Sequence, residues 1–513
     1  MSPARAPGGL ATLLLSLLAL NLVLTLANLW PTPWVRPTAA LSLDLAGLVL
    51  LAALLAEVRG GPGRWLAVLL PILLLAMVLG HYAQITLAGL FGRPVDLASD
   101  LRHLPSLTRM ATRVTPAWLL ALAALALPLA LAALWFLLRA LTRPLLDALG
   151  QSRTRRALAL GAALLLLAGL ALPADWRAPS LAAGAWHQIA KDRSPAKGGL
   201  AVDLSALRGR DLYIVFWESY GATLLDDPAK RAALAPTLAA FEAPGWHVAS
   251  TLVEAPTFGG GSWLSHGSLL TGRMLRDEGR YRQVLTAPGE TLLHQAVTAG
   301  YRTVALMPGL KSHWPEGKTL GFQEILDAEA LDYQGPAFGW WAIPDQASLE
   351  TLYRTEIVPT GRPPLLVVFP SVMSHIPFAP TPPYQPDWSR MAGSTPYDPS
   401  ALAEALADLP EWQNLGPAYL RAVKHNFTWL EGFLRQRAPG DGIVLVLGDH
   451  QPPALISGPD ARWAVPVHVF SKDPGLIERL TAAGLAPGLI PPTETSGDMS
   501  GLISRLFTGL SND

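Results

Sequence analysis

The 513-residue chain contains no cysteine, which excludes disulfide bonds and thiolate metal ligands. Charged residues are scarce, at 15% of the chain against roughly 25% in an ordinary soluble domain. The net charge is zero and no basic cluster stands out beyond the loops of the apolar part, which argues against nucleic acid as a partner. Half of the residues are hydrophobic, and the excess lies before residue 175. The chain therefore divides into an apolar first part and a second part of globular composition.

The first part contains five long apolar stretches, at about residues 8–30, 39–56, 65–90, 116–138 and 157–173. A helix rises 1.5 Å per residue, so stretches of this length can cross the ~30 Å hydrocarbon layer of a bilayer. The first stretch could also be a signal peptide, but its apolar run is too long and more stretches follow. We therefore expect five retained transmembrane helices over residues 1–173.

Arginines between these stretches predict the orientation of the helices. With the N-terminus inside, the inner loops hold the arginine excess, most of it between residues 139 and 156. Five crossings then place the rest of the chain outside the membrane. We expect a multi-pass protein of the bacterial cytoplasmic (inner) membrane whose second part is periplasmic or extracellular.

Two ionisable residues, Asp44 and His81, lie within the apolar stretches. Such groups are costly inside a bilayer and usually have a partner or a function. One interpretation is that Asp44 reaches the headgroup layer while His81 makes one interhelical hydrogen bond. The other is that both residues help to bind a lipid headgroup at the outer leaflet.

Residues 174–210 mix charge, proline and glycine, and predict a linker to a catalytic domain over residues 211–513. In that domain, short apolar runs alternate with helical patterns. Strands are expected at 211–217, 249–254, 302–307, 364–369, 443–447 and 465–470. This alternation predicts an α/β domain with a mostly parallel sheet covered by helices.

Acidic and histidine side chains follow three of the predicted strands. Glu218 ends the first strand, Asp449 and His450 follow "IVLVLG", and His375 comes shortly after "PLLVVF". Ligands of such sheets lie beyond the carboxyl ends of the strands, so we expect these residues on one rim. Two carboxylates and an imidazole suit one divalent metal ion, with Mn²⁺ favoured and Mg²⁺ or Zn²⁺ as alternatives.

The segment "EAPTFGGGSWLSHGSLLTGR" (254–273) predicts a nucleophile beside that metal ion. Its three glycines let the backbone approach a ligand, and Ser262 opens a helix whose N–H groups suit a phosphate or sulfate. A metal ion can lower the pKa of the Ser262 hydroxyl and take it as a fourth ligand. Ser262 could instead be only a helix cap, and Thr257 is a rival nucleophile.

Residues 211–475 resemble the alkaline phosphatase and sulfatase superfamily, most closely its lipoteichoic acid synthase and membrane phosphoglycerol transferase branch. "FWESYG" and "LGDHQP" resemble that branch's metal-binding glutamate and Asp-His pair. "SWLSHGSLLTGR" resembles the sulfatase signature, with Leu264 and His266 in place of its proline and arginine. This departure implies an unmodified serine nucleophile, as in the phosphotransferase branch. "SVMSHIPF" resembles the segment whose histidine lies near the substrate phosphate, which implies that role for His375.

Weaker matches extend the expected site. "SHWPEG" and "FGWWAIPDQ" resemble headgroup-side loops of the family, and a further histidine neighbours the nucleophile. The substrate-binding candidates are therefore Trp314, Trp341, Asp345 and His266, with His313 and Trp340 beside them. His468 lies within a strand and is expected to be a hydrogen-bonded sheet residue rather than a ligand.

The resemblance implies a membrane-anchored, metal-dependent phosphotransferase. Ser262 and His375 are the expected catalytic residues, and the expected metal ligands are Glu218, Ser262, Asp449 and His450. A phospho-headgroup, phosphoglycerol favoured, would pass from a membrane phospholipid donor to a glycan or glycolipid acceptor. The alternatives are phosphoethanolamine transfer, hydrolysis of a sulfate or phosphate ester, and a catalytically inactive membrane-tethered binding protein. The lack of cysteine weighs mildly against phosphoethanolamine transfer.

Overall fold

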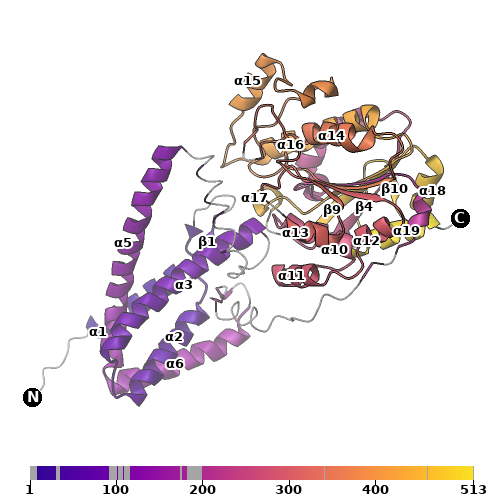
Figure 1. Ribbon diagram of the computed structural model, residues 1–513. Coiled ribbons are helices and arrows are strands. Elements are labelled where there is room, and N and C mark those ends of the chain that lie inside the picture. The colour runs from indigo at the N-terminus through magenta and orange to yellow at the C-terminus, as the bar shows by residue number, and fades with distance from the viewer. Residues whose placement is uncertain are drawn as a thin grey trace, which may run out of the picture. The chain divides into compact units, whose positions relative to one another are not determined.

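The chain forms two compact units, one over Met1–Gly89 and Arg93–Asp192 and the other over Leu90–Gly92 and Arg193–Asp513 (Figure 1). The computed structural model describes residues 8–29, 35–91, 116–173, 176–178, 180–181, 199–200, 202–312, 314–339, 341–458 and 460–511, with residues 101, 105, 108 and 112. Most of the predicted linker, and the arginines of the predicted loop between residues 92 and 115, lie outside the described residues.

The first unit is helical, and each of the five predicted apolar stretches contains one helix. The helices are α1 (Gly8–Val23), α2 (Leu43–Val58), α3 (Arg64–Phe91), α5 (Ala117–Leu149) and α6 (Ser152–Ala171). Their bounds differ from the prediction by more than two residues at four places: the ends of α1 and α5 and the starts of α2 and α6. The first helix ends at Val23 because the chain then turns into a short strand pair, β1 (Ala27–Asn28) with β2 (Val35–Arg36). In α5, leucine, alanine and arginine are good helix formers, so the helix continues past the apolar stretch to Leu149.

Two of the described helices are long and apolar enough to cross a membrane, α3 over Arg64–Leu87 and α5 over Ala117–Leu149. The first helix, α1, is apolar but has only 16 residues, about 24 Å at 1.5 Å per residue. A membrane domain of five crossings therefore stays a prediction.

Both ionisable residues of the apolar stretches have protein partners. His81 Nε2 lies 2.8 Å from the carbonyl oxygen of Leu26. The Asp44 carboxylate accepts hydrogen bonds from the Ser180 hydroxyl and the Leu181 N–H, both at 2.6 Å. Asp44 thus fixes the chain that follows α6 against the start of α2.

The second unit is built on a nine-stranded mixed sheet. Its strands are β3 (Leu212–Trp217), β4 (His247–Glu254), β5 (Arg302–Leu306), β6 (Glu324–Leu326), β7 (Leu365–Pro370), β8 (Ile443–Gly448), β9 (Ala464–Ser471), β10 (Ala486–Pro487) and β11 (Thr495–Asp498). The order is β10-β4-β9-β8-β3-β7-β5-β6, with β11 also paired to β4. Strands β8, β3, β7, β5 and β6 are parallel, whereas β9 is antiparallel to both of its neighbours.

The predicted α/β architecture is confirmed, but the sheet is mixed rather than mostly parallel at its β4 side. All six predicted strands are present within two residues of their expected bounds. The remaining strands, β6, β10 and β11, have only two to four residues each, too few for a period to be visible.

Helices cover both faces of this sheet (Figure 1). One layer contains α9 (Pro228–Ala240), α14 (Asp345–Leu352) and α16 (Gly416–Gln436), and the other contains α10 (Ser262–Thr271), α12 (Leu292–Thr298), α18 (Pro474–Ala482) and α19 (Leu502–Ser511). In β3, alternate side chains enter the two cores, with Tyr213, Val215 and Trp217 on one side and the residues between them on the other. Burial on both faces explains the unbroken apolar runs of the central strands.

The remaining α-helices described in the second unit are short, with four to nine residues each. They are α8 (Thr223–Asp226), α11 (Glu278–Thr286), α13 (Pro315–Leu320), α15 (Pro399–Ala407) and α17 (Ala454–Ser457).

His468 lies inside β9 and is hydrogen-bonded on both ring nitrogens, as expected. Its Nε2 is 3.0 Å from the Tyr220 hydroxyl and its Nδ1 is 2.7 Å from the Ser250 hydroxyl. Complete burial lowers the pKa of His468 to about 3, so the ring is neutral in the folded protein at pH 7.

This buried histidine predicts an acid-sensitive fold. An unfolded histidine takes up a proton near pH 6.5, whereas folded His468 does so only near pH 3. Its contribution to stability is therefore complete above pH 6.5 and is lost as the pH falls toward 3, by about 1.4 kcal/mol per pH unit. We expect His468→Gln to flatten the fall in unfolding free energy between pH 6.5 and 5, measured by urea titration of the second unit's transition in detergent. The exposed His247, changed to Gln, should keep the wild-type slope.

Gly448 ends β8 where the backbone of Tyr220 passes. A Cβ at residue 448 would overlap the Tyr220 carbonyl oxygen, which belongs to the backbone and cannot rotate away. We expect Gly448→Ala to lower the unfolding free energy by about 3 kcal/mol, measured as above. Gly440 is exposed, with no contact closer than 3.7 Å, so Gly440→Ala should have little effect. Equal stability of the two variants would contradict this close packing.

Candidate active site

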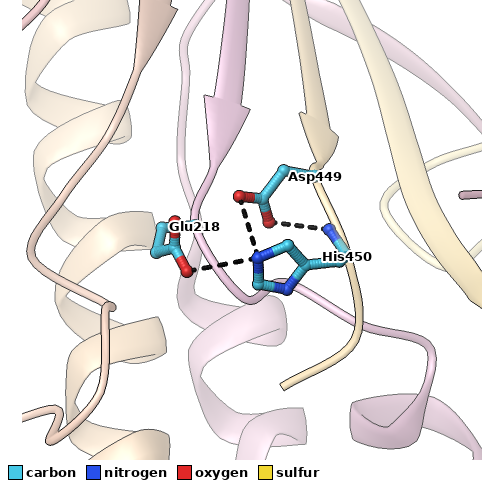
Figure 2. A group of neighbouring side chains, drawn as sticks. All are labelled: Glu218, Asp449 and His450. Carbon is cyan, nitrogen blue, oxygen red and sulfur yellow. Dashed lines mark hydrogen bonds and ion pairs between the residues drawn. The ribbon is translucent and has the colours of Figure 1, made fainter. Parts of the chain in front are cut away.

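Three ionisable side chains meet where β3 and β8 end (Figure 2). The two strands are parallel neighbours, with Trp217 opposite Gly448, so the residues that follow them lie side by side. Ligand atoms of Glu218, Asp449 and His450 all lie within 4.8 Å of one another, and all three residues are buried. The predicted rim therefore brings together the acid of one strand and the Asp-His pair of another.

Hydrogen bonds from the loop after β7 hold the backbone of Glu218. Its N–H donates to the Ser371 hydroxyl at 3.1 Å, and its carbonyl accepts from the Ser374 hydroxyl at 2.6 Å. The Asn426 side chain of α16 donates in turn to Ser374 at 3.0 Å. The Glu218 carboxylate accepts from the Ser219 hydroxyl at 2.9 Å, which orients one of its oxygens.

Asp449 and His450 are oriented by backbone groups. One Asp449 oxygen, Oδ1, accepts from the N–H groups of Ser219 at 2.8 Å and His450 at 2.7 Å. His450 Nδ1 lies 2.8 Å from the Gln451 carbonyl and donates to it. His450 Nε2 therefore faces the carboxylates, 3.5 Å from Glu218 Oε1 and 3.5 Å from Asp449 Oδ2.

The electrostatics of this cluster fit a bound cation. Burial raises the pKa of Asp449 to about 7, and the negative charge of Glu218 adds to the effect. Burial disfavours a charged His450, but Asp449 and Glu218 outweigh it and raise the His450 pKa. Among the described residues, no lysine or arginine forms an ion pair with Glu218 or Asp449. A divalent ion would neutralise both carboxylates, and oxygen donors with one imidazole suit Mn²⁺, Mg²⁺ or Zn²⁺.

Ser262 is the first residue of α10 and reaches the same cluster. Gly261 before it has φ +79°, a left-handed conformation that glycine adopts readily. The Ser262 hydroxyl donates to Glu218 Oε2 at 3.1 Å and lies 3.2 Å from His450 Nε2. It is therefore a possible fourth ligand and sits at a helix N-terminus, where free N–H groups suit a phosphate.

Gln451 links the glycine turn before Ser262 to the loop that carries the candidate ligands Asp449 and His450. Its carbonyl oxygen accepts from His450 Nδ1 and also from the N–H of Gly259, at 3.0 Å. On the other side, the Ser265 hydroxyl of α10 donates to the Asp449 carbonyl at 2.5 Å. Thr257, the rival nucleophile, is buried, and its hydroxyl donates to the Gly260 carbonyl at 2.5 Å, which favours Ser262.

His375 follows β7 and is held by its own loop. Its Nδ1 donates to the Ile376 carbonyl at 2.8 Å, which leaves Nε2 with the lone pair in the neutral ring. Burial lowers the His375 pKa, while the charges of His450 and Asp449 act on it in opposite directions. The Trp341 ring packs edge-on against His375 at 4.9 Å, with Lys311 Nζ 5.5 Å from the Trp341 ring centre. Trp341 therefore lies beside His375, where a substrate contact was predicted.

The other weak candidates have structural contacts. Asp345 is fully buried, and its two oxygens accept from the N–H groups of Val372 at 2.8 Å and Met373 at 3.1 Å. Burial raises the pKa of Asp345 to about 7. These bonds favour a role in positioning the loop that carries His375, and substrate contact by Asp345 stays a prediction.

The remaining candidates are tryptophan and histidine side chains within the core layers. Trp314 packs on Phe322 with ring centres 5.9 Å apart. His266 lies half-buried one turn after Ser262, with its ring 4.5 Å from that of Phe216. These contacts favour packing roles, and substrate binding by either residue stays a prediction. His313 and Trp340 lie outside the described residues.

Sequence reasoning missed the residues that support the ligands. Ser371, Ser374 and Asn426 are buried polar residues that hydrogen-bond around Glu218. Asn426 could have been found from the sequence, because it is a lone amide on the apolar face of α16. The Trp429 ring N–H donates to its side-chain oxygen Oδ1 at 3.1 Å.

No known protein family matches the chain, and no curated protein matches it in sequence. Solved structures do match. The lipoteichoic acid synthase LtaP from Listeria monocytogenes is 16% identical over 53% of this chain and 69% of its own, with a TM-score of 0.34. The C-terminal periplasmic domain of EcEptC from Escherichia coli is 14% identical over 52% and 73%, with a TM-score of 0.34.

The phosphoglycerol transferase GacH from Streptococcus pyogenes is 12% identical over 64% of this chain and 90% of its own, with a TM-score of 0.31. A 2-O GAG sulfatase and an alkaline phosphatase from an Antarctic bacterium also match. The lipoteichoic acid synthase and the phosphoglycerol transferase among them bear names of the branch that the motifs resemble. At such identities and TM-scores, the function is inferred from the site's own residues.

The cluster predicts a measurable metal site. We expect Mn²⁺ to bind one site in wild-type protein, measured by isothermal titration calorimetry in detergent. Asp449→Asn should weaken binding by about tenfold or more, since one of two anionic ligands is lost. Glu324→Gln removes a surface ion pair with Arg302 and should leave binding unchanged. Equal affinity of both variants would exclude Asp449 as a ligand.

Proposed function

We propose that the protein is a membrane-anchored, metal-dependent phosphotransferase with Ser262 as its nucleophile. The observation that carries this proposal is the position of Ser262, whose hydroxyl lies 3.1 Å from Glu218 Oε2 and 3.2 Å from His450 Nε2 at the start of α10. A serine that only capped a helix would not need contacts with two candidate metal ligands.

Glu218, Asp449, His450 and Ser262 are the proposed ligands of one divalent ion, with Mn²⁺ favoured. When bound, the ion would supply charge neutralisation for a phosphate and would favour the deprotonated Ser262 hydroxyl. Glu218 and Ser219 orient the hydroxyl, and the N-terminal N–H groups of α10 receive the phosphate oxygens. The buried position of the cluster strengthens these interactions because little water screens them.

The proposed reaction has two steps. In the first, Ser262 Oγ loses its proton and attacks the phosphorus of a phospholipid, and the bond between phosphorus and the diacylglycerol oxygen breaks. The serine then carries the phospho-headgroup, and diacylglycerol leaves after gaining a proton. In the second, a hydroxyl of a glycan or glycolipid attacks the phosphorus, loses its proton and releases Ser262. Atoms and charges balance over the two steps without an external reductant or oxidant.

His375 is the proposed proton carrier for these oxygens. Its lowered pKa keeps the ring neutral at pH 7, and Nδ1 is engaged by the Ile376 carbonyl. Nε2 can therefore accept a proton from the acceptor hydroxyl in the second step. In the first step, the ring would pass the proton given up by Ser262 to the leaving diacylglycerol oxygen.

Phosphoglycerol is the proposed headgroup, and a glycan or glycolipid hydroxyl is the proposed acceptor. Phosphoglycerol is favoured because the motifs resemble the phosphoglycerol transferase branch most closely. Phosphoethanolamine transfer uses the same residues, and a hydrolase would use water in the second step. An inactive binding protein would not need Glu218, Ser262, Asp449 and His450 in one buried cluster.

The membrane part of the proposal is a five-helix domain with the N-terminus inside and a periplasmic or extracellular second unit. Apolar side chains along α5 support lipid contact, because Trp118, Leu122, Leu125 and Leu129 are all more than half exposed in the folded first unit. Donor and acceptor would both lie at the outer leaflet, so the tether raises their effective concentration at the site.

Release of the lipid headgroup tests the chemistry. Purified full-length protein would be incubated with labelled phosphatidylglycerol or phosphatidylethanolamine in mixed micelles, with Mn²⁺ or with EDTA. We expect diacylglycerol from one of these lipids, at least about 10³-fold reduced by EDTA or by Ser262→Ala. Mass spectrometry of the wild-type protein, without an acceptor, should find the phospho-headgroup on Ser262.

Thr257→Val is the discriminating control, since it removes the hydroxyl of the rival nucleophile. It should retain activity within about tenfold, because its hydroxyl only bonds the Gly260 carbonyl. Full activity of Ser262→Ala would exclude the nucleophile. Turnover of neither lipid by protein with a filled metal site would exclude the lipid donor and leave sulfate and phosphate esters as candidates.

A further inference from the structure

We propose that residues 399–412 form a lipid-contacting edge that holds the rim of the active site on the bilayer surface. This segment, the rim segment, comprises α15 and the turn that follows it. The inference rests on the proposed function, in which the donor is a membrane lipid, and it names the surface through which the catalytic unit meets that lipid.

Exposed apolar side chains concentrate in this segment. The described part of the second unit has six exposed large hydrophobic residues: Val297, Val358, Leu406, Leu409, Trp412 and Ile490. Three of the six belong to the rim segment, and two of these are highly exposed, Leu409 at 72% and Trp412 at 56%. Apolar residues that gather in one short surface segment mark an interaction site more strongly than single exposed ones.

The segment is folded and presents its two faces differently. Leu402 and Ala405 pack partly against the core, whereas α15 has no fully buried residue. Leu406 follows Leu402 by one turn of α15. Glu404 lies on the opposite side of this helix, and Asp408 directly follows its last residue. Asp408 pairs with Arg421 of α16 at 2.8 Å, which fixes the end of the segment to the next helix.

The rim segment is connected through α16 to the loops that carry the candidate metal ligands. It leads directly into α16, which begins at Gly416. In the first turn of α16, the Tyr419 hydroxyl donates to the Ser219 carbonyl at 2.9 Å, beside Glu218. Tyr419 also packs on Phe378, in the loop after His375, with ring centres 5.1 Å apart. The rim segment is thus joined, through the first turn of α16, to the loops that carry Glu218 and His375.

A lipid surface is the occupant that this chemistry fits best. Tryptophan and leucine with polar residues behind them are typical of segments that lie in the membrane interface. The same chain contains α3 and α5, which are long and apolar enough to cross a bilayer, so a bilayer is within reach. The carboxylates of Glu404 and Asp408 disfavour deep insertion, and we infer a shallow contact by Leu406, Leu409 and Trp412.

A site-directed spin label tests the contact without depending on activity. Because the chain has no cysteine, Leu409→Cys places one nitroxide on the full-length protein. The protein would be held in nanodiscs of equal parts phosphatidylcholine and phosphatidylglycerol. We expect the label to be relaxed more strongly by oxygen, which dissolves in lipid, than by a water-soluble nickel chelate.

Val358→Cys is the matched control, since Val358 is also exposed and apolar. It lies toward the opposite edge of the sheet, near Arg362, which pairs with Asp211 just before β3. Its label should be relaxed more strongly by nickel. Equal water access at residues 409 and 358 would overturn the proposal, and so would shielding of residue 409 from both reagents, which indicates a protein contact.

Turnover provides a second test. The double variant Leu406→Glu with Leu409→Glu should release diacylglycerol from bilayer phosphatidylglycerol about tenfold more slowly than wild type. With monomeric dihexanoyl phosphatidylglycerol, it should stay within about twofold of wild type, because the metal cluster is untouched. Val358→Glu should leave both rates unchanged. Equal loss with both donors would overturn the proposal.

If wild-type protein used neither donor, the proposed function would fail, and the spin-label result alone would decide whether the rim segment contacts lipid.

Discussion

The structure of the second unit depends on two carboxylates that folding buries side by side. Glu218 and Asp449 come from adjacent parallel strands, so their separation is set by the spacing of the sheet rather than by flexible loops. Burial raises the pKa of Asp449 to about 7, and the like charge of Glu218 adds to the effect. The serine and backbone hydrogen bonds around them, and the fit to a divalent cation, result from that single constraint.

Much of this arrangement could be predicted from the sequence, because the polar site residues directly follow the apolar runs that form the strands. Continuous apolar runs that stop at Glu218 or at Asp449 predict buried strands with polar ends, and parallel neighbours bring such ends together. The glycine run before Ser262 identifies a helix N-terminus in the same way. These inferences need only local patterns and one general rule of sheet topology.

Other features could not be predicted because tertiary contacts decide them. An apolar run predicts a strand but not its direction, so the reversal of β9 was not visible. The hydrogen bonds of Asp345 to the backbone of the loop after β7 were not visible in the short motif that contains it. Helix ends depend on the neighbouring chain as well as on apolar length, which is why α1 is shorter and α5 longer than their apolar stretches.

The Gln451 carbonyl has a consequence for how the site responds to a substrate. One oxygen atom accepts both from the ring of a metal ligand, His450, and from the glycine turn that precedes Ser262. The proposed nucleophile and this candidate metal ligand are therefore linked through one backbone oxygen, and neither can move far without breaking a shared hydrogen bond. Their geometry is fixed when the chain folds, so a substrate meets a site whose reorganisation is already complete.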